Sequence, residues 1–202
     1  MTWNPVPRPV IRTLLRRSAV LYARHGWNVL AGASLAGDKF DCGTTSCPTI
    51  NCHPVHDDLG AQLRPTADPD LIATWWYRSP YTVLLPTGLG FDVIEVPAYL
   101  GALAARILGE HGPRCPISVS PSGRWMLFVA EGEPLRPELD RQLDIVRHGK
   151  GSWVPAPPSR YPSGRVRWEV SPGTVGWALP GSYPVQNALV DALQLVAPRQ
   201  AA

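Results

Sequence analysis

Five side chains of the kinds that bind metals lie close together in one polar stretch of the chain. Cys42, Cys47, Cys52 and His53 fall within 12 residues, and His56 follows them. Zinc prefers thiolate and imidazole ligands in a tetrahedral site, and short spacings close a small loop around the ion. No helix or strand pattern competes for these residues, so a metal can itself order the loop. We expect a structural zinc site; the alternative is a solvent loop with incidental cysteines, because the spacing is not a common finger spacing.

Composition excludes several classes of protein. The 202 residues are 45% hydrophobic and 17% charged, which suits one domain, or one domain with an insertion. No run approaches the ~18 apolar residues of a membrane helix, and the apolar run 18–23 is too short for a signal peptide. We therefore expect a cytoplasmic protein with no membrane partner, in which clustered cysteines favour metal over disulfides. The net charge of +3 does not by itself imply nucleic acid.

The elements that must position these side chains follow from hydrophobic spacing and from Gly, Pro and Asp signals. The expected helices are residues 9–25, 69–78 with Asp68 as the N-cap, 97–110, 137–147 and 184–196. The expected strands are residues 27–33, 81–85, 91–96, 115–119, 125–129, 152–154 and 166–170. Strands and helices mix without βαβ repetition, which indicates an α+β fold. We expect one domain over residues 1–180 with a polar insertion at 34–66, followed by a C-terminal helix and tail at 181–202.

A set of short motifs occurs in a characteristic order along the chain. They are Tyr22-Ala23-Arg24-His25-Gly26-Trp27, the Cys/His insertion, Thr66-Ala67-Asp68-Pro69, Trp75-Trp76, Pro86-Thr87-Gly88, Phe91-Asp92-Val93-Ile94-Glu95-Val96-Pro97, Ser122-Gly123, Gly149-Lys150-Gly151-Ser152-Trp153-Val154-Pro155-Ala156-Pro157-Pro158-Ser159 and Arg165-Val166-Arg167-Trp168. In this order they resemble the N-terminal domain of bifunctional DNA primase/polymerases, the prim-pol group of archaeo-eukaryotic-type primases. The resemblance is strongest to the short stand-alone versions common in actinobacteria, and it covers about residues 15–170.

The resemblance implies a primase-polymerase-like fold around an RRM-like antiparallel or mixed sheet flanked by helices. It also implies template-directed nucleotidyl transfer with two Mg²⁺ or Mn²⁺ ions, which clamp the attacking and leaving oxygens. The family supplies an acid-x-acid pair on one strand, a third acid on a neighbouring strand, and a His near the hairpin that contacts the nucleotide.

This sequence departs from that pattern at most of its positions. Glu95 matches the first acid, but Pro97 stands at the second, Trp125 at the His position and Val146 near the third acid. Phosphoryl transfer depends on the carboxylates for positioning and charge neutralisation, so these losses argue against an active polymerase.

Other carboxylates are candidates for a shifted catalytic geometry with Glu95. Asp92 is three residues away, so on a regular strand it points to the opposite face. Asp144 shares the face of Val146 if that segment is extended. Glu131 and Glu133 form a further acid-x-acid pair, although Gly132 and Pro134 favour a solvated turn there.

Nucleotide or single-strand binding needs stacking faces and cations more than carboxylates, so a degenerate site can retain it. The resemblance and the charges give six candidate contacts: Ser122, Arg124, His148, Lys150, Ser159 and Arg165. The candidate stacking faces, each of which also suits core packing, are Trp75, Trp76, Trp125, Trp153 and Trp168.

We therefore expect a prim-pol-family protein with a structural zinc loop, a degenerate metal site and binding of nucleotide or single-stranded DNA. A helicase or other replication protein is the expected protein partner. One alternative is a non-catalytic interaction module for a replication, mobile-element or regulatory partner, with the old cleft blocked by Trp125 and Pro97. Another is an active transferase that uses Glu95, Asp92 or Asp144, in which case Mg²⁺ or Mn²⁺ is required.

Overall fold

The computed structural model describes residues 8–44, 47–49, 51–56 and 63–196. The chain divides into two compact units. Unit 1 comprises Met1–Pro86 and Trp153–Arg167, and unit 2 comprises Thr87–Ser152 and Trp168–Ala202. Helices and antiparallel sheets occur in both, so the α+β prediction is confirmed. Within the described ranges, no helix has both the length and the apolar character needed to cross a membrane.

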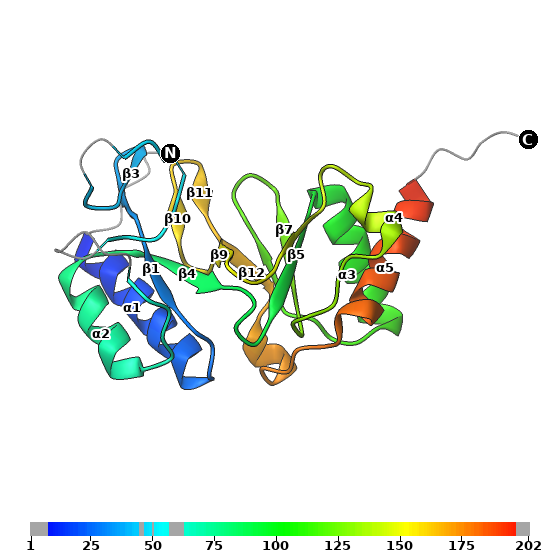
Figure 1. Ribbon diagram of the computed structural model, residues 1–202, viewed down its shortest axis with the longest axis horizontal. Coiled ribbons are helices and arrows are strands. Elements are labelled where there is room, and N and C mark those ends of the chain that lie inside the picture. The colour runs from blue at the N-terminus through cyan, green and yellow to red at the C-terminus, as the bar shows by residue number, and fades with distance from the viewer. Residues whose placement is uncertain (1–7, 45–46, 50, 57–62, 197–202) are drawn as a thin grey trace, which may run out of the picture. The chain divides into compact units, whose positions relative to one another are not determined.

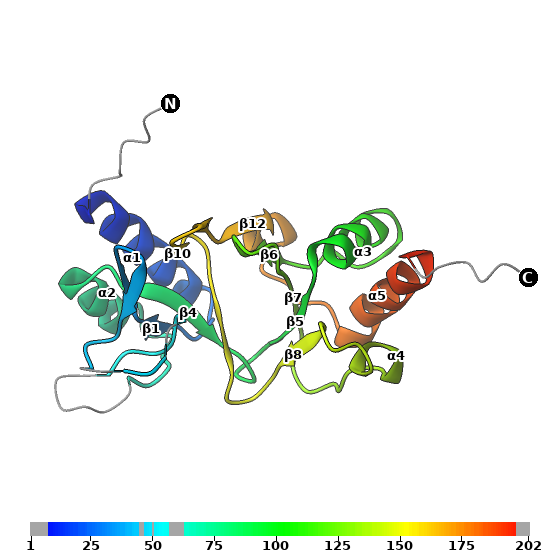
Figure 2. The same cartoon turned by 90° about the horizontal axis from the view of Figure 1, so that it is seen from above.

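Unit 1 places two helices beside a small sheet. The helices α1 (Arg8–Arg24) and α2 (Pro69–Arg78) pack along each other (Figures 1 and 2). Asp68 begins α2 as its N-cap, because Oδ1 accepts hydrogen bonds from the backbone N–H groups of Asp70 and Leu71 at 2.9 and 3.2 Å. The sheet has the order β1-β4-β9 and is antiparallel. Its strands are β1 (Leu30–Gly32), β4 (Thr82–Pro86) and β9 (Trp153–Pro155).

Two short hairpins complete unit 1. The polar insertion that begins at residue 34 starts with a hairpin, which the sequence pattern does not predict. Its two-residue turn, Gly37-Asp38, has Gly37 at φ 63°, which suits the twist of paired strands. The hairpin strands are β2 (Ser34–Ala36), β3 (Lys39–Asp41), β10 (Arg160–Tyr161) and β11 (Gly164–Arg165).

Unit 2 is a five-stranded sheet of order β12-β6-β7-β5-β8 with two long helices. The helices α3 (Ala98–His111) and α5 (Ser182–Val196) pack on each other and cover one face of the sheet (Figure 2). The strands are β5 (Asp92–Val96), β6 (Ile117–Val119), β7 (Trp125–Val129), β8 (Val146–His148) and β12 (Arg167–Val170). A short helix, α4 (Pro137–Asp140), precedes β8, and the 3₁₀ turn η1 (Pro172–Val175) precedes α5.

The predicted helix over 137–147 is wrong beyond its first turn. Helix α4 ends at Asp140, and residues 146–148 become β8, the edge strand that pairs with β5. Leu139 and Ile145 are buried, but Leu143 between them is fully exposed at 102%, so the apolar residues of this segment form no continuous helical stripe. Backbone pairing with β5 decides the conformation, and that pairing is not visible in the local sequence.

The two faces of β5 have different surroundings. Ile94 and Val96 are buried in the core that α3 and α5 form with the sheet. Val93 and Glu95 alternate with them and therefore point to the other face. On that face Glu95 lies opposite Met126 of β7 and Val146 of β8. The fold thus holds one carboxylate on the sheet face that the helices leave uncovered.

Candidate functional site

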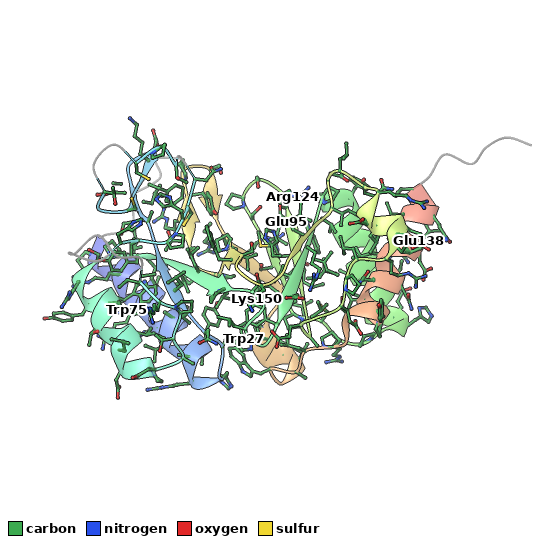
Figure 3. All side chains as sticks on the ribbon, viewed as in Figure 1. Trp27, Trp75, Glu95, Arg124, Glu138 and Lys150 are labelled. Atoms are coloured by element: carbon green, nitrogen blue, oxygen red, sulfur yellow. The ribbon has the colours of Figure 1, made fainter. Side chains whose placement is uncertain are left out.

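The carboxylate of Glu95 is held by two basic side chains. Its Oε1 accepts a hydrogen bond from Nε of Arg124 at 2.7 Å, and Figure 3 labels these two residues. Its Oε2 lies 2.8 Å from Nε2 of His148. The side chain of Glu95 is only 20% exposed, and those of Arg124 and His148 are 26% and 18% exposed. Both oxygens of the carboxylate are therefore occupied by groups of the protein itself.

These contacts fix the charge of Glu95. Burial raises its pKa, but hydrogen bonds and charge from His148 and Arg124 together lower it by more, so the pKa lies below its ordinary value. An ionised carboxylate only accepts hydrogen bonds, so Nε2 of His148 carries the proton. The other ring nitrogen, Nδ1, lies 3.0 Å from Oγ of Ser152. Ser152 thereby fixes the orientation of the imidazole.

The β6–β7 hairpin positions Arg124. The hydroxyl of Ser120 accepts from the Arg124 backbone N–H at 3.1 Å and lies 2.8 Å from Oγ of Ser122. Gly123, between Ser122 and Arg124, has φ 81° in the turn of this hairpin. At its far end, Nη2 of Arg124 donates to the backbone carbonyl of Asp144 at 2.6 Å. Arg124 thus joins the hairpin, Glu95 and the loop before β8.

Two glycine-containing loops position the segment after His148. The hydroxyl of Thr87 donates to the backbone carbonyl of Gly149 at 2.6 Å. Gly88 has φ 69°, and a Cβ there would lie 2.3 Å from Cα of Lys150, so only glycine fits this contact. The side chain of Lys150 is exposed, and it pairs with no acid in the described part of the chain.

Asp92 lies on the opposite face of β5 from Glu95, as their spacing predicts. Its Oδ2 accepts from Nη2 of Arg147 at 2.6 Å and from the backbone N–H of Gly132 at 3.0 Å. The Asp92 side chain is 3% exposed and that of Arg147 is 30% exposed, so the carboxylate of this ion pair is shielded from solvent. Asp144 contributes only its backbone carbonyl to the Glu95 site, and its residue is exposed.

The residues around Glu95 do not fit a two-metal centre. Such a centre needs several carboxylates converging on both ions. Val146 stands directly opposite Glu95 on β8, at the position where the resemblance places the third acid. Pro97 occupies the second position and is the N-cap of α3. A metal ion could be shared by three Cys, His, Asp or Glu side chains at one place in the described ranges. That place is the Cys/His stretch of unit 1 and not the surroundings of Glu95.

Trp125 does not block this site, so that part of the interaction-module hypothesis is wrong. Trp125 pairs with Val96 and belongs to the helix-side core. A Cβ built on Gly101 of α3 would lie 2.4 Å from the Trp125 ring, so the indole fills the space against that helix. The neighbouring Arg124, not Trp125, reaches Glu95.

The other candidate stacking faces are partly or fully used in packing. Trp76 is completely buried, and its Nε1–H donates to the backbone carbonyl of Tyr81 at 2.7 Å. Trp168 packs against Phe128, with ring centroids 5.3 Å apart. Trp75 and Trp153 are half-buried.

The Cys/His stretch of unit 1 gathers three of its five predicted ligands. One ligand atom each of Cys42, Cys47 and His53 lies within 4.8 Å of the others. Nδ1 of His53 lies 2.7 Å from the backbone carbonyl of Asn51, which can only accept, so Nδ1 carries the proton. Nε2 is then the free ligand nitrogen, and it lies 3.4 Å from Sγ of Cys47. A carbonyl that fixes the tautomer in this way is typical of metal-binding histidines.

The thiols of the stretch differ in acidity. Burial raises the pKa of Cys42, but hydrogen bonds, among them one from the backbone of Thr44, outweigh it and lower the pKa to about 6. Cys52 lies outside the group, and burial raises its pKa to about 12 despite a hydrogen bond with Thr82. His56 also lies outside, with Nδ1 3.4 Å from Oγ1 of Thr44. A thiolate is the form that binds metal, which suits Cys42 as a ligand, whereas Cys52 lies outside the group of ligand atoms that are close enough to share an ion.

Ser159 and Arg165 belong to unit 1, whereas the Glu95 site lies wholly in unit 2. Ser159 is fully buried, and its Oγ bonds both the backbone N–H and the carbonyl of Val83, at 3.0 and 3.2 Å. It therefore fastens the loop after β9 to β4. Arg165 is exposed on β11.

Three hydroxyls that organise the Glu95 site are not predicted by any sequence pattern: Thr87, Ser120 and Ser152. Thr87 and Ser152 stand inside quoted motifs, but no spacing rule distinguishes their hydroxyls from those of ordinary turn residues. Glu131 and Glu133, the other acidic pair, accept hydrogen bonds from backbone N–H groups and form no shared site in the described structure.

Comparison with known proteins gives one family. The family described as "Bifunctional DNA primase/polymerase, N-terminal" matches residues 19–184, which is most of the chain and spans both units. No curated protein matches the chain.

Proposed function

Because this chain belongs to the bifunctional DNA primase/polymerase N-terminal family, we propose that it binds a nucleotide or single-stranded DNA at the Glu95 site without two-metal nucleotidyl transfer. The observation that carries the proposal is the engagement of both Glu95 oxygens by Arg124 and His148. A catalytic divalent ion needs those same oxygens and at least one further carboxylate.

Positive charge around Glu95 supports the binding of phosphate. Arg124 has five N–H donors, of which Nε and Nη2 are used and Nη1 donates to no acceptor in the described structure. Lys150 stands in the loop that follows β8. Among the described residues, Glu95 is the one carboxylate that pairs with Arg124, and Lys150 pairs with none, so cations exceed acids in these ion pairs. Arginine suits the bidentate recognition of phosphate oxygens.

A binding titration tests this proposal. Labelled dATP and labelled single-stranded DNA are titrated with the full chain, with and without Mn²⁺, at two salt concentrations. We expect dATP binding that needs no Mn²⁺ and weakens about tenfold or more in Arg124→Ala, because a charged hydrogen bond is lost. Arg124→Lys keeps the charge and should restore part of the affinity. Arg114→Ala, an exposed arginine of the same unit, is the matched control and should bind as the wild type.

Two results would overturn the proposal. Mn²⁺-dependent binding that Glu95→Gln abolishes would restore the catalytic interpretation and justify primer-extension assays. Absence of binding to either ligand would leave the second candidate function, an interaction module. One observation favours that candidate: Leu143 is 102% exposed and Val146 is 42% exposed beside the Glu95 site, as apolar contacts for a replication, mobile-element or regulatory partner would be.

We further propose that Cys42, Cys47 and His53 hold a structural zinc ion. The donor set of two sulfurs and one imidazole nitrogen is of the type zinc prefers, and the tautomer of His53 presents Nε2 to it. Bound zinc would tie the segment after β3 to residue 53. Metal analysis of the purified protein should find one zinc per chain, lost in Cys47→Ser and kept in Cys52→Ser. Equal zinc content in the wild type and Cys47→Ser would contradict this assignment.

A further inference from the structure

A groove between the helices α1 and α2 of unit 1 has the features of a second binding site. Its volume is about 280 Å³, and its lining consists of Arg16, Ala73, Thr74, Tyr77 and Arg78. The small side chains of Ala73 and Thr74 leave this space at the surface where the two helices pack. The groove belongs to unit 1 alone and shares no residue with the Glu95 site.

The wall of the groove presents an aromatic ring to solvent. Tyr77 is 71% exposed, more than Tyr99 at 54% or Tyr183 at 46%. Arg12 links the two helices at this point, because its Nη1 donates to the Tyr77 backbone carbonyl at 3.1 Å. The Arg12 guanidinium carbon also lies 5.8 Å from the centre of the Tyr77 ring. A ring that is this exposed and lies beside a cation can stack on a ligand.

The charges around this ring are all positive. Helix α1 carries arginines and no acidic residue, and α2 has its acid, Asp70, in the first turn, at the opposite end from Tyr77. Neither Arg16 nor Arg78 forms an ion pair with an acid of the described residues. Arg12 and Arg16 are four residues apart, a rise of about 6 Å along the helix, so they form a row beside the groove. The groove therefore attracts anions, because none of its lining side chains is an acid that would neutralise the arginines.

We infer that this groove binds single-stranded nucleic acid, with a base stacked on Tyr77 and the neighbouring phosphates on Arg16 and Arg78. An exposed aromatic ring flanked by cations is the combination that binds single strands without reading sequence. An acidic peptide shares the charge but needs apolar anchor pockets, and Tyr77 is the one large apolar side chain in the lining. The nucleic-acid assignment does not rest on nucleotide binding at Glu95.

Fluorescence anisotropy with labelled single-stranded oligothymidylate and the full chain tests the groove. We expect Tyr77→Ala to weaken binding about tenfold and Tyr77→Phe, which keeps the ring, to bind as the wild type. Tyr99→Ala is the matched control, because Tyr99 is a 54% exposed tyrosine of unit 2. Tyr77 is exposed, so its substitution should leave folding intact, and circular dichroism checks this.

The salt dependence gives an independent measurement on a second variant. Removing one phosphate contact to a single strand lowers the slope of log K against log salt by about 0.7. Arg16→Gln should show this decrease, whereas Arg114→Gln, an exposed arginine of unit 2, should not. Groove variants that bind oligonucleotide like their controls would overturn the inference. Displacement of the oligonucleotide by a polyglutamate peptide at lower concentration would also overturn it and identify an acidic protein as the ligand.

The two proposals fail in different ways. The Tyr77 and Arg16 variants should bind dATP normally, because the Glu95 site lies in the other unit. If only Arg124→Ala loses dATP binding, the dATP site is at Glu95. If only Tyr77→Ala loses oligonucleotide binding, the oligonucleotide site is the groove.

Discussion

Replacing Glu95 by Gln should destabilise the protein by an amount that depends on pH. The substitution keeps the shape of the side chain but removes the charge that Arg124 and His148 contact at 2.7 and 2.8 Å. Each charge-assisted hydrogen bond contributes about 1.5–3 kcal/mol, and the amide retains a weaker bond in its place. Because the side chain is 20% exposed, the lower end applies, and we expect a loss of about 2 kcal/mol at pH 7. For a chain of this size that is a decrease in Tm of about 4–8 °C.

The sign of the pH dependence follows from the lowered pKa of Glu95. A carboxyl with a lowered folded-state pKa stabilises the fold above its unfolded pKa of about 4.3, and that stability is lost as pH falls through the folded value. The difference in Tm between wild type and Glu95→Gln should therefore have its largest value at pH 7 and decrease below about pH 4.3. Thermal melts followed by circular dichroism at pH 7, 5 and 3.5 measure it.

Glu110→Gln is the matched control for this prediction. Glu110 is 49% exposed and pairs with Arg106 one helical turn away at 3.3 Å. An exposed pair of this kind contributes about 0.5 kcal/mol or less, so we expect a change in Tm of about 1–2 °C. Equal effects of the two substitutions at pH 7, or an effect of Glu95→Gln that does not change with pH, would refute the electrostatic account of the site.

Three further predictions concern other parts of the two units. Gly88→Ala should lower the free energy of unfolding, measured by chemical denaturation, by more than about 1 kcal/mol. The reasons are that φ of Gly88 is 69° and that a Cβ there would lie 2.3 Å from the backbone of a neighbouring loop. Gly109→Ala is the control and should not be destabilising, because nothing lies within 4 Å of a Cβ built there. Val146→Asp should weaken dATP binding about tenfold, because it adds a negative charge opposite Glu95, and Val146→Asn, which adds none, should bind as the wild type in the same titration. Chelation of zinc should lower the Tm of the wild type but leave that of Cys47→Ser unchanged, and an equal decrease in both would show that the chelator acts elsewhere.

Much of the local structure follows from the sequence. The N-cap signal at Asp68 and Pro69 predicts the start of α2, and the alternation of a strand predicts that Asp92 and Glu95 point to opposite faces. The expected strand over 91–96 matches β5 to within one residue. These features depend on neighbours within a few residues, which the sequence displays directly.

The contacts of the site depend on pairing between distant segments. Strand β8 forms because its backbone pairs with β5, although residues 137–147 have a helical pattern. Arg124 rather than Trp125 meets Glu95 because the register of β7 turns Trp125 toward Gly101. A shift of one residue in a strand exchanges its two faces, so alignment by motif alone is least accurate here.

Which of the Cys and His residues come together in space could not be predicted from the sequence either. Five Cys and His residues share a short segment, but Cys52 is half-buried and lies outside the group of three that converge. The strand pairs around the segment decide which thiols meet, and the spacing of the five residues does not distinguish them.

Direct measurement of Mn²⁺ binding to the zinc-loaded protein tests the central claim that Arg124 and His148 replace metal at Glu95. Electron paramagnetic resonance of free Mn²⁺ reports the bound fraction without any nucleotide present. The account predicts that the wild type and Glu95→Gln bind Mn²⁺ equally weakly. One Mn²⁺ bound per wild-type chain and none in Glu95→Gln would contradict it.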